Sequence, residues 1–394
     1  MTEHGVGGVR LSTRSPLDVV RPAYGRASLA ELLPSALAVL GVPEAPDPLG
    51  LTARLDGVRR IAVLVVDGLG SYQIPLATPH APTLADVARA ATHLTSVFPS
   101  TTPAGLASIG AGAVPGAHGL LAFTVNVPGT DRVLNHTQWW DDPDPAAWQP
   151  VPSRLAVARA AGVAATVVSR PEYAGSGLTV AAWRGADYRA APDADALVTG
   201  MLDGLAADGR ALVLGYHPSV DSAGHRFGLG SPEWRAAVSE LDGLLARLVE
   251  GLPADAALLV TADHGQLDVP DEGRYDVDAD PRLDAGLRLV AGEPRVRYLH
   301  TLPGADDDVV EAWRGVLGAD AWVAPREEVV EAGWFGPVPD AHLGRIGDVV
   351  VISHGLTAVL ATAREPETVA KLVAYHGSYT AAEMMVPLIV VRGV

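Results

Sequence analysis

Six short apolar runs constrain the fold of this 394-residue sequence more than any other feature. The runs are rich in valine, isoleucine and leucine and are bounded by turn residues. They cover residues 61–66, 165–169, 211–216, 257–261, 349–353 and 387–391. Continuous rather than alternating apolarity is typical of strands that are buried on both faces. The sequence therefore predicts a sheet that is covered by helices.

Helix-like stretches lie between or beside these runs. They cover residues 84–91, 152–161, 194–206, 232–250 and 367–374. Alternating strands and helices predict an α/β fold with a mostly parallel central sheet flanked by helices. Ligands of such sheets bind at the carboxyl ends of the strands. The residues that follow each apolar run are therefore the first candidates for a functional site.

Two regions interrupt this alternation. Residues 123–150 are rich in proline, aspartate and tryptophan, and residues from about 268 to 347 contain short strand-like pieces. The first region predicts an irregular insert, and the second predicts a small cap-like insert. We expect one domain over residues 26–394 that carries both inserts, preceded by an N-terminal arm over residues 1–25.

The composition excludes several classes of protein. The formal net charge of −17 argues against a nucleic-acid polymer as partner, because a polyanion needs a basic surface. The absence of cysteine excludes disulfides and thiolate metal ligands. Lys371 is the only lysine, so the chain has no phosphate-binding loop of the GxxxxGK[ST] type.

The hydropathy of the chain points to an expected location. No apolar run approaches the roughly 20 residues that a membrane-spanning helix needs. The N-terminus has no apolar segment of the signal-peptide type. We therefore expect no membrane span and a cytoplasmic protein.

Acidic and histidine side chains gather around the ends of the apolar runs. They are Asp67, Asp221 with His225 four residues later, Asp263 with His264 beside it, and, ahead of the last run, His376. A single aspartate at a strand end is an ordinary turn residue. Several aspartates together repel one another unless a cation holds them. Aspartate and histidine without cysteine form oxygen and nitrogen sites that suit Zn²⁺ or Mn²⁺.

A run of hydroxyl residues, Ser100-Thr101-Thr102, precedes Pro103 and a stretch of small residues suited to a helix. Pro103 takes a first-turn position, where its missing N–H costs nothing. A hydroxyl there lies at the positive end of the helix dipole, an arrangement that binds phosphate. Thr102 is therefore either a simple helix cap or, beside a metal ion that lowers the pKa of its hydroxyl, a nucleophile.

In combination, five motifs resemble the alkaline phosphatase superfamily and, more closely, its nucleotide pyrophosphatase/phosphodiesterase branch. The motifs are VVDGLG, FPSTTPAGLASIGAGAVPGAHG, DSAGHRFG, TADHG and HGS, and they span residues 65–378. Their order and spacing carry the resemblance. It implies one alkaline phosphatase-like catalytic domain over most of the chain.

The resemblance also implies two Zn²⁺ ions, with Mn²⁺ as an alternative. One ion would be held by Asp67, Thr102, Asp263 and His264, and the other by Asp221, His225 and His376. Thr102 matches the nucleophile of the family, because it lies sixteen residues before His118 of PGAHG. Thr101 takes that place if the register shifts by one. No ligand position matches His118, His217 or His354, for which we expect structural roles.

The activity implied by the resemblance is hydrolysis of a phosphoric ester. The first hypothesis is a phosphodiesterase or nucleotide pyrophosphatase that acts on a small phosphate ester, with a nucleotide as one candidate. On the same core, the alternatives are a phosphomonoesterase, a phosphonate hydrolase and a mutase. The non-catalytic alternatives are an inactive metal-binding module and a nucleotide-binding α/β protein with chance aspartate and histidine residues.

One position departs from the family pattern. Gly105 stands where the phosphodiesterases commonly have an asparagine that contacts a phosphate oxygen. A backbone amide, a water molecule or Asn126 could substitute for it. Substrate choice would come from the inserts, where a base could stack on Trp139, Trp140 or Trp148, although these residues can equally be packing anchors. Arg184 and Arg226 are candidates for the extra cation that a monoesterase needs.

Overall fold

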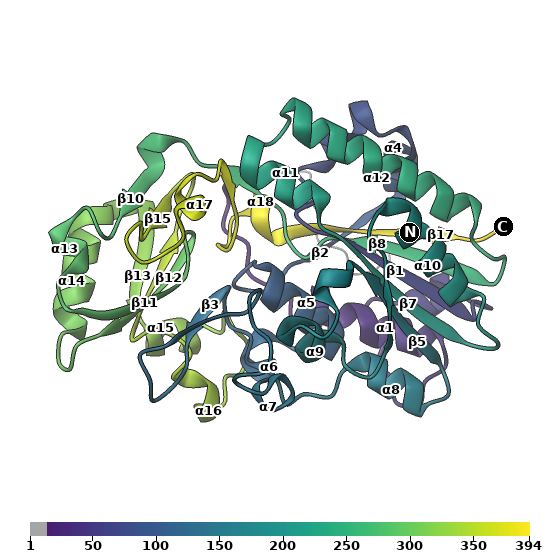
Figure 1. The fold of residues 1–394 in the computed structure, drawn as a ribbon, viewed down its shortest axis with the longest axis horizontal. Helices are drawn as coiled ribbons and strands as arrows, with labels where there is room; N and C mark the ends of the chain where they lie inside the picture. The colour runs from purple at the N-terminus through teal and green to yellow at the C-terminus, as the bar shows by residue number, and fades with distance from the viewer. Residues whose placement is uncertain (1–13) are drawn as a thin grey trace, which may run out of the picture.

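The computed structural model describes residues 14–394, so residues 1–13 of the predicted arm lie outside the described part. A seven-stranded sheet with the order β2-β17-β8-β1-β7-β5-β6 forms its centre (Figure 1). The strands are β1 (Arg60–Val66), β2 (Thr92–Thr95), β5 (Ala164–Ser169), β6 (Asp187–Ala190), β7 (Ala211–His217), β8 (Ala256–Thr261) and β17 (Met385–Arg392). Strand β1 is parallel to β7 and β8, whereas β17 is antiparallel to β8. The predicted α/β fold with a mostly parallel central sheet is confirmed.

Helices cover both faces of this sheet (Figure 1). On one face lie α4 (Pro82–Val87), α10 (Ala194–Leu205) and α12 (Pro232–Glu250), and on the other α1 (Leu32–Val39), α5 (Thr102–Ala111), α8 (Arg154–Ala160) and α9 (Gly177–Trp183). All residues of β7 and β8 are buried, which explains why their sequences are apolar without alternation. Across residues 14–394, none of the helices has the length and apolarity that crossing a bilayer requires.

The register of the central strands brings three strand ends to one level. Val65 of β1 lies opposite Tyr216 of β7 and opposite Thr261 of β8. Because the three strands are parallel, the residues that follow them meet at one edge of the sheet. This edge is where the sequence places most of the candidate ligands.

A second, antiparallel sheet of six strands, here called the cap sheet, lies beside the central sheet (Figure 1). Its order is β13-β14-β12-β11-β3-β4. The strands are β3 (Thr124–Asn126), β4 (Val133–Asn135), β11 (Leu287–Glu293), β12 (Val296–Thr301), β13 (Ala321–Pro325) and β14 (Val349–Ser353). The cap sheet therefore joins strands from both predicted inserts. Its helices are α13 (Pro281–Asp284), α14 (Asp306–Leu317), α15 (Arg326–Glu331) and α16 (Asp340–Leu343).

Two expectations from the apolar pattern differ from the structure. Residues 349–353 form β14 of the cap sheet rather than a strand of the central sheet. This strand is fully buried, so its sequence looks like that of a central strand. Residues 367–374 form only the short helix α17 (Glu367–Ala370), because the chain then pairs as β16 (Ala374–Tyr375) with β9 (Leu267–Asp268).

The described part of the predicted arm, residues 14–25, packs against the chain that precedes α18 (Ala381–Met384). The amide of Val20 donates to the carbonyl of Tyr379 at 2.8 Å, and the Val20 side chain is buried. The division of the chain into an arm and a domain stays a prediction.

Two buried histidines, His118 and His136, make the stability of the fold depend on pH. Burial lowers the pKa of His118 to about 3 and that of His136 to about 4. Both rings stay neutral in the folded state, whereas in the unfolded chain they take up a proton below pH 6.5. The free energy of unfolding should therefore fall as pH drops from 6.5 toward 4, by up to about 1.4 kcal/mol per pH unit for each ring.

Urea unfolding of the wild type and of His136→Gln between pH 7.5 and 4.5 measures this effect. In the variant, the free energy of unfolding should depend less on pH, by about the contribution of one histidine. His80→Gln, a change at an exposed histidine, should keep the full dependence. Equal slopes for the wild type and His136→Gln would contradict the prediction.

Candidate functional site

The seven predicted site residues meet at the carboxyl edge of the central sheet. Asp67 follows β1, Thr102 begins α5, Asp221 and His225 lie on α11 (Ser219–Phe227), Asp263 and His264 follow β8, and His376 follows β16. Strands β1, β7 and β8 pair in parallel and end at one level, so the residues that follow them lie close together. The loop between β16 and α18 adds the last residue from a part of the chain that is distant in sequence.

The first group of ligand atoms comes from Asp67, Asp263 and His264. The Nε2 atom of His264 lies 3.4 Å from Asp67 Oδ1 and 3.5 Å from Asp263 Oδ2. Both of these carboxylate oxygens are buried, and neither accepts a hydrogen bond from a described residue. Buried carboxylate oxygens without a donor are costly unless a cation replaces the donor. The three side chains therefore fit a divalent cation.

The hydroxyl of Thr102 reaches the same group. Its Oγ1 atom lies 3.1 Å from His264 Nε2. The N-cap of α5 is Thr101, so Thr102 is not the capping residue. The Thr101 hydroxyl is buried and has no hydrogen-bond partner among the described residues. Of the two threonines, Thr102 is the one whose hydroxyl contacts a candidate ligand.

The second group consists of Asp221, His225 and His376. The Nε2 atoms of the two histidines lie 3.1 Å apart, and Asp221 Oδ2 lies 3.3 Å from His225 Nε2. Each histidine uses Nδ1 to donate to a backbone carbonyl, Ala374 O at 2.7 Å for His225 and Ser100 O at 2.9 Å for His376. In the neutral rings the two Nε2 lone pairs therefore face each other. A cation between them removes this repulsion, so this group also fits a metal ion.

The two groups are contiguous. The rings of His264 and His376 stack with their centroids 3.6 Å apart. Ligand atoms of Asp221, His264 and His376 lie within 4.8 Å of one another, as do those of Asp67, Asp263 and His264. Oxygen and nitrogen donors of this kind suit Zn²⁺ or Mn²⁺.

The electrostatics of the site indicate missing positive charge. Burial and the nearby carboxylates of Asp221 and Asp263 raise the pKa of Asp67 well above its usual value. Burial likewise raises the pKa of Asp221. Burial and the neighbouring histidines lower the pKa of His376 well below its usual value. A bound cation would lower the raised pKa values of the carboxyl groups and would favour the same neutral form of the imidazole, so it fits all three shifts.

Three neighbours that the sequence did not reveal as site residues hold the ligands in place. The Tyr216 hydroxyl donates to Asp67 Oδ2, and Gln266 Nε2 donates to Asp221 Oδ1. Gly68 has a φ of +71°, and a Cβ atom there would lie 3.0 Å from Asp221. Gly68 belongs to the VVDGLG motif, and Tyr216 ends the apolar run at 211–216. In the sequence, the motif position of Gly68 and the strand-end position of Tyr216 were the features that could have identified them as site residues.

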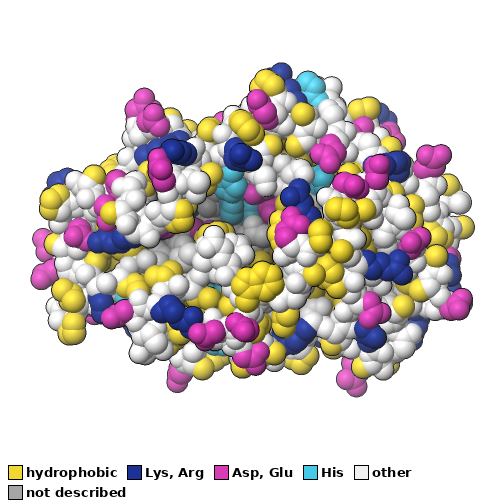
Figure 2. All heavy atoms as spheres, in the orientation of Figure 1, with side chains coloured by type: hydrophobic (Ala, Val, Ile, Leu, Met, Phe, Trp, Pro, Cys, Tyr) yellow, Lys and Arg dark blue, Asp and Glu magenta, His cyan; other side chains and the backbone are white. Residues whose placement is uncertain are grey.

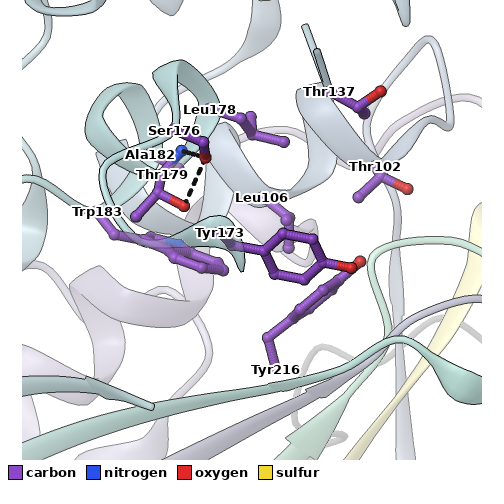
Figure 3. A pocket seen from close by; sticks show the side chains of 10 residues that line it. All are labelled: Thr102, Leu106, Thr137, Tyr173, Ser176, Leu178, Thr179, Ala182, Trp183 and Tyr216. Carbon is purple, nitrogen blue, oxygen red and sulfur yellow. Dashed lines mark hydrogen bonds between the residues drawn. The ribbon is translucent and has the colours of Figure 1, made fainter. Parts of the chain in front are cut away.

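An apolar cavity of about 110 Å³ lies beside Thr102. Figure 3 shows the aromatic rings of Tyr173, Trp183 and Tyr216 gathered in it, with Thr102 at its edge. Leu106 and Leu178 complete the apolar wall. The cavity can therefore receive an apolar or aromatic group next to the hydroxyl.

A second cavity, of about 230 Å³, lies beside His225 and His376 and is lined on its other side by the cap sheet. Figure 2 shows a hollow between the cap and the central sheet, with histidine side chains in its wall. Glu293, the last residue of β11, lines this cavity, and burial raises its pKa to about 8. None of the described residues that line either cavity is lysine or arginine.

Two of the three tryptophans proposed for stacking, Trp139 and Trp148, serve as packing residues. Trp139 and Trp148 are buried in one apolar cluster, where Trp139 donates to Pro143 O and Trp148 to His136 Nε2. Trp140 is exposed and lines neither cavity. Burial in the cluster leaves no ring face of the first two for a ligand.

The two candidate arginines also lie outside the cavities. Arg184 donates to the carbonyls of Gln149 and Val151, and so joins α9 to the first insert. Arg226 is exposed and lies over the ring of Phe227. Neither residue lines the cavity beside Thr102 or the one beside His376.

The position of the family asparagine is closed by packing. A Cβ atom on Gly105 would lie 2.9 Å from Asp263 Cβ, so a side chain there would displace a candidate ligand. Asn126 lines a separate hollow with Asp131 and Arg288, which contains none of the predicted ligands. Residue 105 is therefore a glycine with no room for a side chain, and Asn126 does not line the cavity beside Thr102.

The three histidines without a predicted ligand position lie outside both ligand groups. His118 Nε2 pairs with Ser108 Oγ at 2.8 Å inside the core. His354 pairs with the Tyr379 hydroxyl at 2.8 Å. His217 is buried, and burial lowers its pKa to about 4.

Solved structures of known proteins share the fold of this chain. Murine ectonucleotide pyrophosphatase/phosphodiesterase 5 is 19% identical with a TM-score of 0.67, and the match covers 83% of this chain and 87% of that chain. A phosphonoacetate hydrolase from Sinorhizobium meliloti, in complex with phosphonoacetate, is 20% identical with a TM-score of 0.65, covering 86% and 91% of the two chains. At these identities the likeness concerns the fold. No curated protein matches the sequence.

A family model matches most of the chain. Residues 61–379 match the family described as type I phosphodiesterase / nucleotide pyrophosphatase. The matched segment contains all seven candidate site residues and both cavities. The chain therefore belongs to the type I phosphodiesterase / nucleotide pyrophosphatase family, a family of phosphoester hydrolases.

Proposed function

We propose that this protein hydrolyses small phosphodiesters in two displacements, with Thr102 as the nucleophile and two divalent metal ions. The observation that carries the proposal is the Thr102 hydroxyl, 3.1 Å from His264 Nε2 at the start of α5 and beside two contiguous groups of candidate ligands. A binding module has no use for a hydroxyl in that position. A threonine-to-alanine variant of murine ectonucleotide pyrophosphatase/phosphodiesterase 5, described as inactive and in complex with AMP, supports this role.

The ligand sets proposed for the two ions follow the two groups of side chains. Asp67, Asp263 and His264, with Thr102, would hold one ion, and Asp221, His225 and His376 would hold the other. When bound, such ions lower the pKa of a hydroxyl and neutralise charge that develops on phosphate oxygens. We propose Zn²⁺ as the resident ion, with Mn²⁺ as the alternative.

In the first displacement Thr102 Oγ1 loses its proton to solvent and attacks phosphorus, and the bond from phosphorus to the leaving oxygen breaks. The leaving oxygen then takes up a proton. The amide end of α5 provides partial positive charge next to the phosphate. In the second displacement water attacks the phosphothreonine, which releases the phosphate monoester and restores the Thr102 hydroxyl.

The walls of the site favour a diester over a monoester. A phosphodiester carries one negative charge, whereas a monoester or a phosphonate carries a second one near neutral pH. None of the described residues lining the two cavities is lysine or arginine, so neither of these cationic side chains is there to pair with that second charge. The apolar cavity beside Thr102 suits a nucleoside or an aryl group as the ester that stays on the phosphorus.

One paired assay tests the proposed function. The purified protein should contain about two metal ions per chain and cleave bis-p-nitrophenyl phosphate at least about tenfold faster than p-nitrophenyl phosphate. Chelation should remove both activities, and Zn²⁺ or Mn²⁺ should restore them. Faster cleavage of the monoester would leave the proposed two-ion site in place but would contradict the proposed phosphodiester substrate. A metal-free protein that cleaves neither ester would refute the proposal.

A further inference from the structure

The positions of the two cavities give the substrate a direction, if the proposed function holds. Thr102 lines the apolar cavity, whereas His225 and His376 line the cavity under the cap sheet. In an in-line displacement the leaving group departs on the side of phosphorus opposite the nucleophile. Of these two cavities, the one beside the two histidines is the one that Thr102 does not line, so we assign the leaving group to it.

Glu293 is the buried carboxyl group in that cavity. It ends strand β11, is 4% exposed, and its Oε1 atom has no hydrogen-bond partner among the described residues. The segment that carries His376 is fitted around it, because Gly377 has a φ of +129° and a Cβ atom there would lie 2.8 Å from Glu293 Cδ. A buried carboxyl oxygen without a partner needs a hydrogen bond from a ligand or from water.

The other polar side chains of the cavity are mostly uncharged. The uncharged ones are Thr124, Asn135, Gln138, Thr368 and Tyr375. The second carboxylate, Glu365, is already paired with Arg297 at 2.5 Å. An anionic leaving group such as pyrophosphate would therefore find no lysine or arginine among the described lining residues. An uncharged alcohol that carries a further hydroxyl would find several hydrogen-bonding partners.

We propose that Glu293 is a specificity-determining residue that hydrogen-bonds a hydroxyl group of an uncharged alcohol leaving group. The enzyme then favours diesters of such alcohols over pyrophosphate bonds. This inference rests on the proposed function and narrows its substrate class. It assigns the discrimination to a residue of the cap, outside the seven candidate ligands.

Methyl aryl phosphodiesters test the proposal, because methoxide is a poor leaving group and the phenol must occupy the leaving-group cavity. Three nitrophenols are compared, substituted with a hydroxymethyl, a methyl or a carboxylate group. In the wild type, kcat/KM should be about tenfold higher for the hydroxymethyl than for the methyl compound, and lowest for the carboxylate. Glu293→Leu should abolish the hydroxymethyl preference, whereas Glu293→Gln should retain most of it.

The ratio of kcat/KM for the hydroxymethyl compound to kcat/KM for the methyl compound is compared between variants. The intrinsic reactivities of the phenols cancel in this comparison. Leu178→Ala, a change in the opposite cavity, should leave the ratio as in the wild type. If Glu293→Leu does not fold, Glu293→Asp, which withdraws the carboxyl by one methylene, should lower the ratio instead.

An unchanged ratio in Glu293→Leu, or a wild type that prefers the carboxylate compound, would overturn this inference. Cleavage of bis-p-nitrophenyl phosphate would then still support the proposed function. Absence of all diester cleavage would instead refute the proposed function itself.

Discussion

Replacing Thr102 with alanine should reduce diester cleavage by on the order of 10³-fold or more, while the fold and the metal content stay largely intact. The Thr102 hydroxyl is the only hydroxyl among the described residues that lies within hydrogen-bonding distance of His264 Nε2. Its removal takes away the proposed nucleophile but none of the carboxylate or imidazole ligands. Steady-state assays with bis-p-nitrophenyl phosphate, together with elemental analysis, measure both parts of this expectation.

The neighbouring threonine provides a matched control. Thr101 differs from Thr102 by one position and has a buried hydroxyl without a hydrogen-bond partner among the described residues. Thr101→Val, which keeps the shape and replaces the hydroxyl with a methyl group, should retain activity within a few-fold, because the Thr101 hydroxyl is not hydrogen-bonded to any candidate ligand. If Thr101→Val is the inactive variant and Thr102→Ala is active, the nucleophile assignment is wrong by one residue.

Rapid acid quenching during turnover adds a direct measurement. Peptide mapping should find the phosphoryl adduct on the peptide that contains Thr102, and the adduct should disappear in Thr102→Ala. Direct attack of water on the substrate would leave no adduct in either protein. That result would keep the metal site and remove the two-displacement mechanism.

The candidate ligands could be predicted from the sequence because their positions depend on local rules. Asp67 directly follows β1 and Asp263 comes two residues after the end of β8, and the ends of these buried parallel strands coincide, so a strand prediction is also a prediction of the site. Asp221 and His225 lie one turn apart on α11, a spacing that is visible in the sequence. His376 was a candidate from its place ahead of the last apolar run, but local rules do not predict its contact with His225, because the loop that carries it reaches the site through tertiary packing.

The cap could be predicted only as interruptions of the pattern. Its sheet pairs β3 with β11, and these strands are more than 150 residues apart along the chain. No local periodicity records such a pairing, and for the same reason the buried run at 349–353 looked like a central strand. Trp139 and Trp148 could not be distinguished from ligand-binding rings, because the sequence does not say which side of a loop faces the core. Glu293 had no local signal at all.

Removing one ligand from either group should lower the metal content from about two ions per chain to about one. Asp263→Asn should deplete the first group of its ion, and His376→Ala should deplete the second group. Each change leaves its group with too few ligand atoms, and Asp263→Asn also removes a negative charge. Each loss should reduce diester cleavage by roughly 10²-fold or more, since a bound ion supplies several kcal/mol of transition-state stabilisation.

Elemental analysis after gel filtration gives the stoichiometry, and thermal unfolding with and without chelator gives a second readout, because an ion bound only to the folded state raises the unfolding temperature. His354→Gln is the matched control, since this histidine pairs with Tyr379 and lies in neither group. If both ligand variants keep the wild-type stoichiometry, the facing nitrogens of His225 and His376 and the unpaired oxygens of Asp67 and Asp263 must be satisfied by protons and water instead. The site would then bind phosphate without metal, and the two-ion mechanism would fall even if Thr102 proved essential.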